Sequence, residues 1–541
     1  MAAAVEAGVT VFDTARSYEG SEALLAHALH GLPKARVVTK GGMARPAGAW
    51  VPDGRGRTIR ADCEASLTAL GGLPIDLYLL HAPDPRTPWR TSMRALARLV
   101  DDGLVARVGV CNVNRAQLDE ALEHAPIAAV EVGISPFDDR ALRGGVLDRC
   151  ADLGIAVIAH SPLGGPRRVR RLARDERLVE LARAHDVTEA EVVLSWLLGL
   201  GENVVAIPGG RTPEATRSAA SAAKLSLTDE ERARIGRAWA PARATRGPGD
   251  VVLVMGIPGA GTSLLAAEYV EPGYARLNRD ERRGSLGDVA TALEEALGAG
   301  SREFVLDNTY LTRAARSHVV EAATRHGVPV RCVWVEITLA QAQVNLVERL
   351  LEQFGALPTS EELEAAPRSM AGALTPTQQM RAFRELEPPA DDEGFASVER
   401  VSYVRTEHAG TTGVFVAAAA AARLPRAGRK ATAPHRLRLE ARRVERRARG
   451  GGRARPALCL GRDRGGALPA PGWPAGLLVS PASARSPTRL RATTRHRSVA
   501  GGRGRCERGA SHAREHPRRT VRRGLVAQLP SGQPPRCSTI G

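Results

Sequence analysis

Four polar residues in the first part of the chain could together protonate a carbonyl group. Asp13, Lys40 and His81 each end an apolar, β-rich run, and Tyr18 follows in the loop TARSYEGSE. A tyrosine ionises near about pH 10, and a lysine ammonium beside it favours the phenolate that remains after proton transfer. Asp13 would hold Lys40, and His81 could donate a hydrogen bond to the carbonyl oxygen. We therefore predict a site in which Tyr18 protonates oxygen while a hydride reaches carbon.

These residues lie within a regular alternation of strands and helices. Amphipathic helical runs, such as 21–32 and 92–103, separate short apolar runs typical of buried strands. The predicted strands are 9–14, 36–40, 76–81, 107–112, 128–135, 155–161 and 204–209. Repeated βαβ units of this kind predict a parallel sheet closed into a (β/α)8 TIM barrel, whose active site lies at the carboxyl ends of the strands. Only seven strands are recognisable, so we expect a barrel that lacks its first strand and exposes two strand edges.

A second α/β unit is predicted after the barrel. A buried strand at 251–255 runs into the glycine-rich GIPGAGTS at 256–263, and a helix follows. Glycines let backbone N–H groups approach a phosphate, and a helix N-terminus favours an anion, so we expect a P-loop that binds ATP. Thr262 replaces the usual lysine of this motif, and Ser263 would bind Mg²⁺. A glycine-rich turn without a ligand is the alternative.

The charge of the chain is concentrated in its last part. The formal net charge is +17, but residues 421–541 hold 29 Lys+Arg against 5 Asp+Glu, which leaves −7 for residues 1–420. A nucleic acid partner is therefore possible but unsupported by the charge of residues 1–420. The tail at 402–541 is rich in Arg, Ala, Gly and Pro and lacks periodicity. We expect it to be disordered, or to be read in a shifted frame of GC-rich DNA.

These patterns predict four segments. They are a barrel at 1–240, a linker at 241–249, an ATP-binding P-loop unit at 250–401 and the low-complexity tail at 402–541.

The seven cysteines include no CxxC pair, which is typical of a reducing cytoplasm. No apolar run is long enough for a membrane span, and the first residues carry no basic region typical of a signal peptide.

Several motifs of residues 3–240 resemble those of the aldo-keto reductases in order and spacing. They are FDTARSYEGSE, VVTKGG, LYLLHAPD, VGVCNVN, AHSPLGG and VVAIPGGRTPEATR. The resemblance implies a nicotinamide cofactor, usually NADP with NAD possible, bound across the barrel mouth. It makes Tyr18 the proton donor, Asp13 and Lys40 the residues that tune it, and His81 the residue that orients a small carbonyl substrate. The cofactor-binding residues that it implies are Asn112, Glu131, His160, Ser161, Leu163, Gly209, Arg211 and Arg217.

Four positions depart from the family pattern. Cys111 replaces a serine, Glu131 a glutamine and Ala219 an asparagine, and His160 stands where the family often has a tyrosine. Glu131 would place a carboxylate near the carboxamide of the cofactor. We expect each change to weaken cofactor binding.

Residues 250–401 resemble the kinase domain of polynucleotide kinases, through the P-loop, RLNRDERRG and EFVLDNTYL. The resemblance makes Asp280 the general base on an accepting hydroxyl and Arg349 a lid arginine, a role for which Arg279 and Arg282 compete. The ATP-binding residues that it implies are Gly256, Gly259, Gly261, Thr262, Ser263, Asp307 and Arg349.

Three functions remain open at this point. The first is an oxidoreductase fused to a P-loop kinase-like unit, and the second is an ATP-dependent kinase with a non-catalytic barrel. The third is a truncated product without catalysis, because a first strand, the P-loop lysine and a regular tail are all missing. The complete set of Asp13, Tyr18, Lys40 and His81 favours the first.

Overall fold

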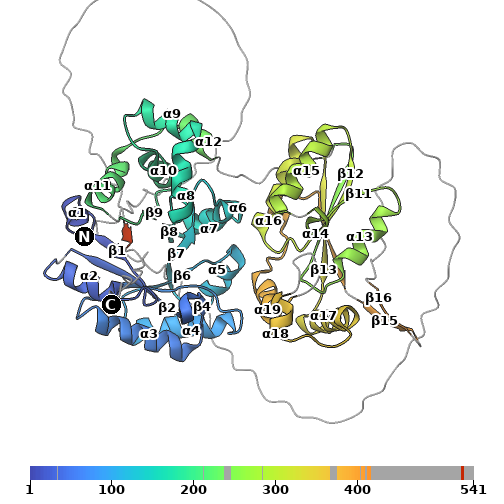
Figure 1. The fold of residues 1–541 in the computed structure, drawn as a ribbon, viewed down its shortest axis with the longest axis horizontal. Helices are drawn as coiled ribbons and strands as arrows, with labels where there is room; N and C mark the ends of the chain where they lie inside the picture. Colours follow the sequence, from blue (N-terminus) through green and yellow to red (C-terminus); the bar gives the residue numbers. More distant parts are fainter. Residues whose placement is uncertain are drawn as a thin grey trace, which may run out of the picture.

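The structure is a computed structural model that shows two α/β units, a barrel-like unit followed by a P-loop-type unit (Figure 1). The residues that it describes are 1–32, 34–210, 212–236, 245, 247–282, 284–365, 374–402, 404–408, 411–415 and 526–528. Arg211 and most of the tail lie outside this part, so the expected disorder or frame shift of the tail stays a prediction.

The first unit has the barrel-like parallel sheet that the sequence predicts. Its seven predicted strands occur in the order β1-β2-β5-β6-β7-β8-β9, and each pairs in parallel with the next. Their bounds are β1 (Val11–Asp13), β2 (Arg36–Gly41), β5 (Ile75–Leu80), β6 (Val108–Cys111), β7 (Ile127–Gly133), β8 (Ala156–His160) and β9 (Val204–Ile207). A small hairpin, β3 (Met43–Ala44) and β4 (Val51–Pro52), extends from the loop after β2.

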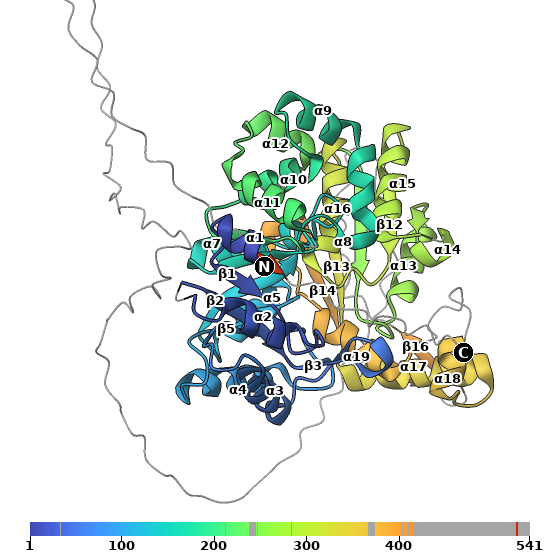
Figure 2. The same cartoon turned by 60° about the vertical axis from the view of Figure 1, so that its left-hand side comes forward.

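Helices surround this sheet on its outer side. For example, α3 packs against β2 and β5, α4 packs against β6, and the two helices contact each other (Figure 2). The helices are α1 (Ala2–Glu6), α2 (Ser21–Leu29), α3 (Gly56–Ala69), α4 (Trp89–Asp101), α5 (Arg115–Leu122), α6 (Arg140–Arg143), α7 (Val146–Leu153), α8 (Gly165–Arg168), α9 (Glu176–Ala184), α10 (Glu189–Leu198), α11 (Pro213–Ser221) and α12 (Asp229–Ile235). Three short 3₁₀ helices are η1 (Pro46–Gly48), η2 (Val169–Arg174) and η3 (Ala222–Lys224).

The pleat of the strands explains why two charged residues enter the barrel interior. Val11 and Val38 belong to a small buried cluster made of strand residues only, apart from the larger cluster that includes the surrounding helices. Successive side chains of a strand point to opposite faces, so Asp13 and Lys40 share the face of Val11 and Val38. Both therefore point inward at the carboxyl ends of β1 and β2.

A short segment from the far end of the chain covers the edge of β1. β17 (Val526–Gln528) pairs in parallel with β1, with Val526 opposite Val11 and Gln528 opposite Asp13. It also contacts β9, and Figure 1 shows it in red beside β1. The sequence predicts an exposed edge here and a tail without structure. In the structure this edge of β1 is paired instead, because buried backbone N–H and C=O groups require partners.

The second unit is a five-stranded parallel sheet in the order β11-β12-β10-β13-β14. The strands are β10 (Asp250–Met255), β11 (Ala275–Leu277), β12 (Glu303–Asp307), β13 (Val330–Glu336) and β14 (Ser397–Ser402). The helices are α13 (Thr262–Val270), α14 (Arg279–Arg282), α15 (Leu286–Gly298), α16 (Arg313–Arg325), α17 (Leu339–Phe354), α18 (Ser360–Ala365) and α19 (Pro376–Glu385), with η4 (Asp391–Glu393) as a 3₁₀ turn. A hairpin of β15 (Val404–His408) and β16 (Thr411–Phe415) follows.

The order of these strands places the P-loop where a ligand site is expected. Strand β10 lies between β12 and β13, so the chain reverses its direction of winding at β10. Open α/β sheets bind ligands at such a switch point, beyond the carboxyl ends of the strands. Apolar clusters cover both faces of the sheet, which makes β10 fully buried apart from its first residue.

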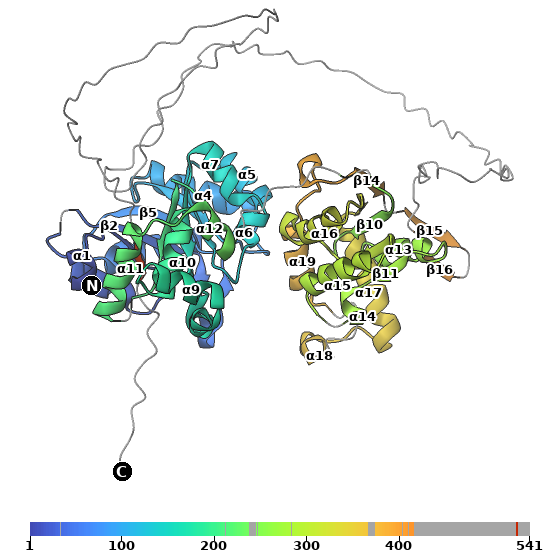
Figure 3. The same cartoon turned by 90° about the horizontal axis from the view of Figure 1, so that it is seen from above.

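The two units contact each other through α5 and α6 of the barrel and α16 and α19 of the second unit (Figure 3). Asn114 and Gln117, which form the capping box of α5, also donate hydrogen bonds to the carbonyl oxygens of Glu385 and Arg384. Beside them, Arg143 pairs with Glu321 at 2.7 Å. The start of α5 is therefore tied to the end of α19.

No helix within the described ranges is both long and apolar enough to cross a membrane. Within the same ranges, His, Cys, Asp and Glu side chains nowhere gather in a group of three or more that could hold a metal ion.

Candidate active site

The four predicted catalytic residues meet at one end of the barrel. Asp13 is the last residue of β1, Lys40 lies near the end of β2, and His81 directly follows β5. The loop after β1 returns Tyr18 to this end, with its ring centre 5.8 Å from Lys40 Nζ. The ring centres of Tyr18 and His81 are also 5.8 Å apart. Parallel barrel strands end at the same side, which is why residues so distant in sequence converge here.

Lys40 and Asp13 form a fully buried ion pair. Lys40 Nζ donates to both carboxylate oxygens of Asp13, at 2.6 and 2.5 Å, and to the carbonyl oxygen of Thr14 at 3.1 Å. Burial alone would lower the pKa of Lys40, but the charges of Asp13 and Glu131 raise it well above its ordinary value. Lys40 is therefore a fixed ammonium beside the ring of Tyr18.

Tyr18 and His81 carry opposite pKa shifts with the same main cause. Burial raises the pKa of Tyr18 to about 12, although the charge of Lys40 acts in the lowering direction that the sequence predicts. Burial lowers the pKa of His81 to about 3, and the charge of Lys40 adds to the decrease. Near neutral pH the site therefore holds a phenol and a neutral imidazole. Tyr18 has a proton to give, and His81 can take part only as a neutral hydrogen-bonding group.

Trp50 is a residue at this site that the sequence analysis missed. It lies between β3 and β4, and its ring stands 5.5 Å from that of His81 and 6.2 Å from that of Tyr18. The guanidinium of Arg45 covers it at 4.1 Å. The Trp50 side chain is 49% exposed, so it forms an aromatic wall open to solvent beside the predicted catalytic residues. The only sequence signal is a tryptophan in a loop rich in Gly and Pro.

Asn112, His160 and Ser161 form one hydrogen-bonded group beside the predicted catalytic residues. Asn112 donates to the carbonyl oxygen of His81 at 3.1 Å and accepts from His160 Nε2 at 2.8 Å, while His160 Nδ1 lies 3.2 Å from Ser161 Oγ. Burial lowers the pKa of His160 to about 4, so this imidazole is neutral. Asn112 and Ser161 both have positive φ, 57° and 51°. Such backbone strain in non-glycine residues is found at sites where function fixes the conformation.

Glu131 reaches the barrel interior from β7. Its Oε2 lies 3.2 Å from Lys40 Nζ, yet this buried oxygen has no hydrogen-bond partner. An ammonium has three N–H donors, and Asp13 and Thr14 already take all three of Lys40. The free acceptor fits the amide N–H donors of a nicotinamide carboxamide, so the residues present are compatible with the cofactor that the sequence resemblance implies.

The remaining predicted cofactor residues lie around the ends of β8 and β9. Leu163 follows β8 and packs against the core, and Gly209 follows β9 beside open space. Arg217 lies on α11, where it faces Glu6 of α1 at 3.5 Å, with both side chains largely exposed. Arg211 lies outside the described residues. Arg217 is thus near the barrel end, held only by a weak surface pair.

The P-loop adopts the strand, loop and helix that the sequence predicts. It connects β10 to α13, with Gly256 directly after the strand and Thr262 as the first residue of the helix. Gly259 and Gly261 have φ of 92° and 87°, which only glycine adopts without cost. A side chain at Gly259 would also collide with the carbonyl oxygen of Ala342. The glycines are therefore required by the shape of the loop.

Two neighbouring helices hold this loop. Asn345 of α17 donates to the carbonyl oxygen of Gly259 at 2.7 Å, and Gln379 of α19 donates to that of Pro258 at 2.9 Å. These bonds fix the carbonyl groups on the outside of the turn. The loop and the start of α13 thus fit a phosphate through their backbone, while Thr262 supplies a hydroxyl where the motif has an ammonium.

The other predicted kinase residues are only partly brought together. Asp307 is buried at the end of β12, where Arg276 forms an ion pair with it and Asn278 donates to it at 3.2 Å. Ser263, at the start of α13, is exposed. A metal role for Asp307 would require Arg276 to leave it. Asp280 lies nearby on α14 and pairs with Arg279. Arg349 is exposed on α17, and no contact places it at the loop.

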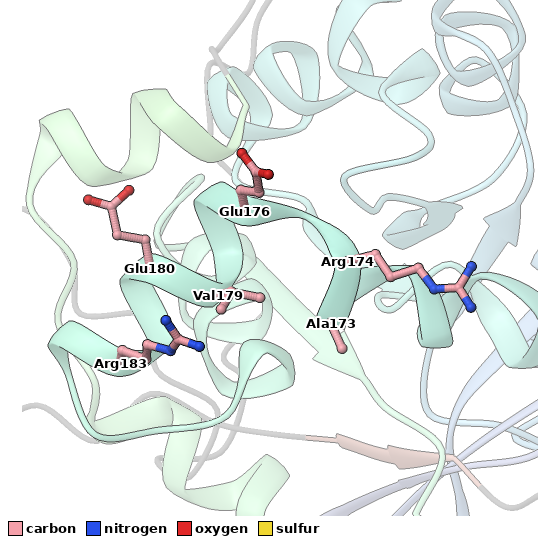
Figure 4. A pocket seen from close by; sticks show the side chains of 6 residues that line it. All are labelled: Ala173, Arg174, Glu176, Val179, Glu180 and Arg183. Atoms are coloured by element: carbon pink, nitrogen blue, oxygen red, sulfur yellow. The ribbon is translucent and has the colours of Figure 1, made fainter.

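A pocket formed by residues of neither candidate site lies on η2 and α9. It is lined by Ala173, Arg174, Glu176, Val179, Glu180 and Arg183 (Figure 4). None of the residues predicted from the sequence contributes to it. Its charged side chains lie on an exposed helix face, which is the ordinary composition of a protein surface.

Comparisons with known proteins agree with this architecture. A family model described as the aldo/keto reductase family matches residues 1–240, and one described as an AAA domain matches residues 251–371. The aldo-keto reductase str7 of Strobilurus tenacellus is 29% identical over 265 residues, 43% of this chain and 78% of that protein.

A probable aldo-keto reductase 1 of Glycine max is 31% identical over 236 residues, 37% of this chain and 67% of that protein. Among solved structures, an aldo-keto reductase from Klebsiella pneumoniae in complex with NADPH is 28% identical, with a TM-score of 0.38 over 43% of this chain and 81% of that chain. The chain therefore belongs to the aldo/keto reductase family of oxidoreductases and carries a P-loop AAA domain after its barrel.

Proposed function

We propose that the barrel reduces a small aldehyde or ketone with NADPH, and that it can run the reverse oxidation of the alcohol. The observation that carries this proposal is the fixed ammonium of Lys40, 5.8 Å from the ring of Tyr18 and paired to Asp13. A phenol beside a permanent positive charge is suited to give its proton to an oxygen that gains negative charge.

The residues of the chain divide the work as follows. When bound, the nicotinamide supplies a hydride to the carbonyl carbon. Tyr18 gives its proton to the carbonyl oxygen, and Lys40 stabilises the phenolate that remains. His81 is neutral, so it orients the same oxygen by a hydrogen bond without titrating during the reaction. Trp50 limits the space above the reacting carbon and shields it from water.

The cofactor would be held by the groups near the ends of β6 to β9. Asn112, His160 and Glu131 would contact the carboxamide side, and Ser161 and Leu163 would cover the cofactor from the turn after β8. Gly209, Arg211 and Arg217 would bind the adenosine phosphate, which is the reason to propose NADP ahead of NAD. A phosphate would replace Glu6 as the partner of Arg217.

The four described free cysteines are buried, which supports a location in the reducing cytoplasm.

The proposal is tested by NADPH oxidation with a series of small aldehydes and ketones. Tyr18→Phe should lower kcat/KM by about 10²–10⁴ because it removes the hydroxyl group that carries the transferable proton and leaves the ring in place. The variant should still bind NADPH, measured by quenching of protein fluorescence. If Tyr18→Phe retained full activity, Tyr18 would not be the proton donor.

The second unit supports a further candidate function, phosphorylation of a hydroxyl acceptor by ATP. The observation that favours it is the P-loop, held by Asn345 and Gln379 at the switch point of the sheet. Asp280 would accept the hydroxyl proton, Arg349 would close over the phosphate, and Ser263 with Asp307 would hold Mg²⁺. Thr262 lacks the charge that usually contacts the phosphates.

Thr262→Lys should strengthen ATP binding about tenfold or more, because one charge-assisted hydrogen bond contributes about 1.5–3 kcal/mol. Isothermal titration of the full chain with ATP and Mg²⁺ measures this change, and Thr291→Lys, on the exposed face of α15, is a matched control. An unchanged affinity in Thr262→Lys would mean that the loop does not hold phosphates.

A further inference from the structure

The catalytic lysine is shared by two carboxyl groups. Asp13 from β1 takes two of the N–H donors of Lys40, and Glu131 from β7 approaches Lys40 Nζ to 3.2 Å with its Oε2 atom, which has no hydrogen-bond partner. All three side chains are buried, with exposed fractions of 0%, 0% and 3%. Glu131 is therefore close enough to act on the same charge as Asp13, from another strand of the barrel.

The charges of these three groups do not balance if both carboxyls are ionised. Two carboxylates and one ammonium would leave a net negative charge in the barrel interior, where water does not solvate it. An unbalanced buried charge is costly, and two close carboxyls avoid it by keeping one proton. The other titratable groups that face Glu131 are Cys111 of β6 and Tyr18. Burial raises the pKa values of both above their ordinary values, so neither supplies a charge.

We propose that Glu131 is a positioning residue of the reductase site, which holds one proton, donates it in a hydrogen bond to Asp13, and stops the reaction when it ionises. With Glu131 neutral, Lys40 has one counter-charge and its remaining field acts on Tyr18. With Glu131 ionised, a second negative charge would oppose the phenolate. This inference rests on the proposed reduction, and it gives Glu131 a second role beside its proposed contact with the cofactor carboxamide, namely to regulate proton transfer through Asp13 and Lys40.

The proton balance of the step is simple. The Tyr18 O–H bond breaks, its proton moves to the carbonyl oxygen, and the hydride comes from the reduced nicotinamide. The proton of Glu131 stays on the Glu131–Asp13 pair throughout.

The electrostatics of the site agree with this arrangement. Burial is the largest cause that raises the pKa of Glu131, to about 8, and repulsion from Asp13 is the next largest. A hydrogen bond with Asp13 acts in the same direction. Glu131 in turn contributes to the raised pKa of Tyr18.

The consequence is a defined dependence on pH. A carboxyl with a raised pKa is protonated below that pKa and loses its proton as the pH rises through it. Reduction should therefore be fast at neutral pH and fall on the alkaline side, by about tenfold for each pH unit once the pair has ionised. The apparent pKa of this decrease belongs to Asp13 and Glu131 together.

The test is the profile of kcat/KM against pH, from about pH 5 to about pH 10, for the wild type, Glu131→Gln and Glu22→Gln. Glu131→Gln keeps the shape of the side chain and cannot ionise, so its profile should lose the alkaline decrease. Glu22 is a matched control, a buried carboxylate of α2 that accepts a hydrogen bond from Thr39 at 2.7 Å. Glu22→Gln should keep the decrease. An unchanged decrease in Glu131→Gln would overturn the proposal.

A second measurement does not depend on activity. Infrared difference spectra between the wild type and Glu131→Gln should show the C=O band of a protonated carboxyl at neutral pH, and the band should vanish at high pH. Absence of the band at neutral pH would overturn the proposal even if no substrate were found. If the proposed reductase function itself is wrong, neither the wild type nor any variant will oxidise NADPH at any pH. The infrared band of Glu131 can still be measured in that case.

Discussion

The pairing of Lys40 shows how much one buried charge depends on its neighbours. Asp13 satisfies two of its donors, and Glu131 stands 3.2 Å away as a second carboxyl. Breaking a buried ion pair by removing one partner costs about 3–5 kcal/mol when the other charge is left alone. In this site the other charge is not left alone, because Glu131 can ionise and take the place of Asp13.

Asp13→Asn should therefore lower the free energy of unfolding by less than about 3 kcal/mol, because Glu131 becomes the counter-charge of Lys40. The double variant Asp13→Asn with Glu131→Gln leaves the ammonium alone, and it should cost about 3–5 kcal/mol. Urea unfolding of the single and double variants measures both values. If Asp13→Asn alone lowered the free energy of unfolding as much as the double variant does, Glu131 would not replace Asp13 as the partner of Lys40, and the idea of a shared lysine would be contradicted.

The strand elements were predictable because their signal is local. Each of the seven barrel strands is a short apolar run bounded by turn residues, and all seven occur in the structure. The residues Asp13, Lys40 and His81 were found because they end such runs. Trp50 and the contact of Glu131 with Lys40 were not found, since both depend on loops and strands that meet only in the closed sheet.

β17 was not predictable for a different reason. Its three residues lie in a segment whose composition is dominated by Arg, Gly and Pro, and nothing in them marks a strand. What makes a strand there is the free edge of β1, which offers N–H and C=O groups to any extended segment that reaches it. An element formed by a partner so distant along the chain has no local signal.

Ala527→Pro tests whether this strand supports the barrel. Ala527 lies opposite Phe12, and proline removes its N–H and fixes its backbone. The free energy of unfolding should fall by about 1–3 kcal/mol, measured by urea unfolding, and activity should fall because β1 carries Asp13. A matched control is Ala510→Pro in the same tail. Equal stability of Ala527→Pro and the wild type would mean that β17 contributes nothing to the barrel.

The whole molecule joins its two sites through one helix. Gln379 of α19 holds the P-loop at Pro258, and the carbonyl groups of Arg384 and Glu385 at the other end of α19 accept hydrogen bonds from the start of α5. Asn112, a proposed cofactor residue, lies two residues before that helix cap. The sequence of neither unit predicts that α19 contacts both the P-loop and α5, because the surfaces that form these contacts meet only after both units have folded.

The central claim, that the barrel transfers a hydride while Tyr18 supplies the proton, is tested most directly by isotope transfer. The full chain is mixed with a small aldehyde and with NADPH deuterated on one or on the other face of its reactive carbon, in two separate reactions, and the alcohol is analysed by mass spectrometry. We expect one deuterium on the carbinol carbon, from one face of the cofactor only, and a transfer at least about 10²-fold slower in Tyr18→Phe. Bound NADPH without transferred deuterium for any aldehyde, or equal transfer in Tyr18→Phe, would contradict the account.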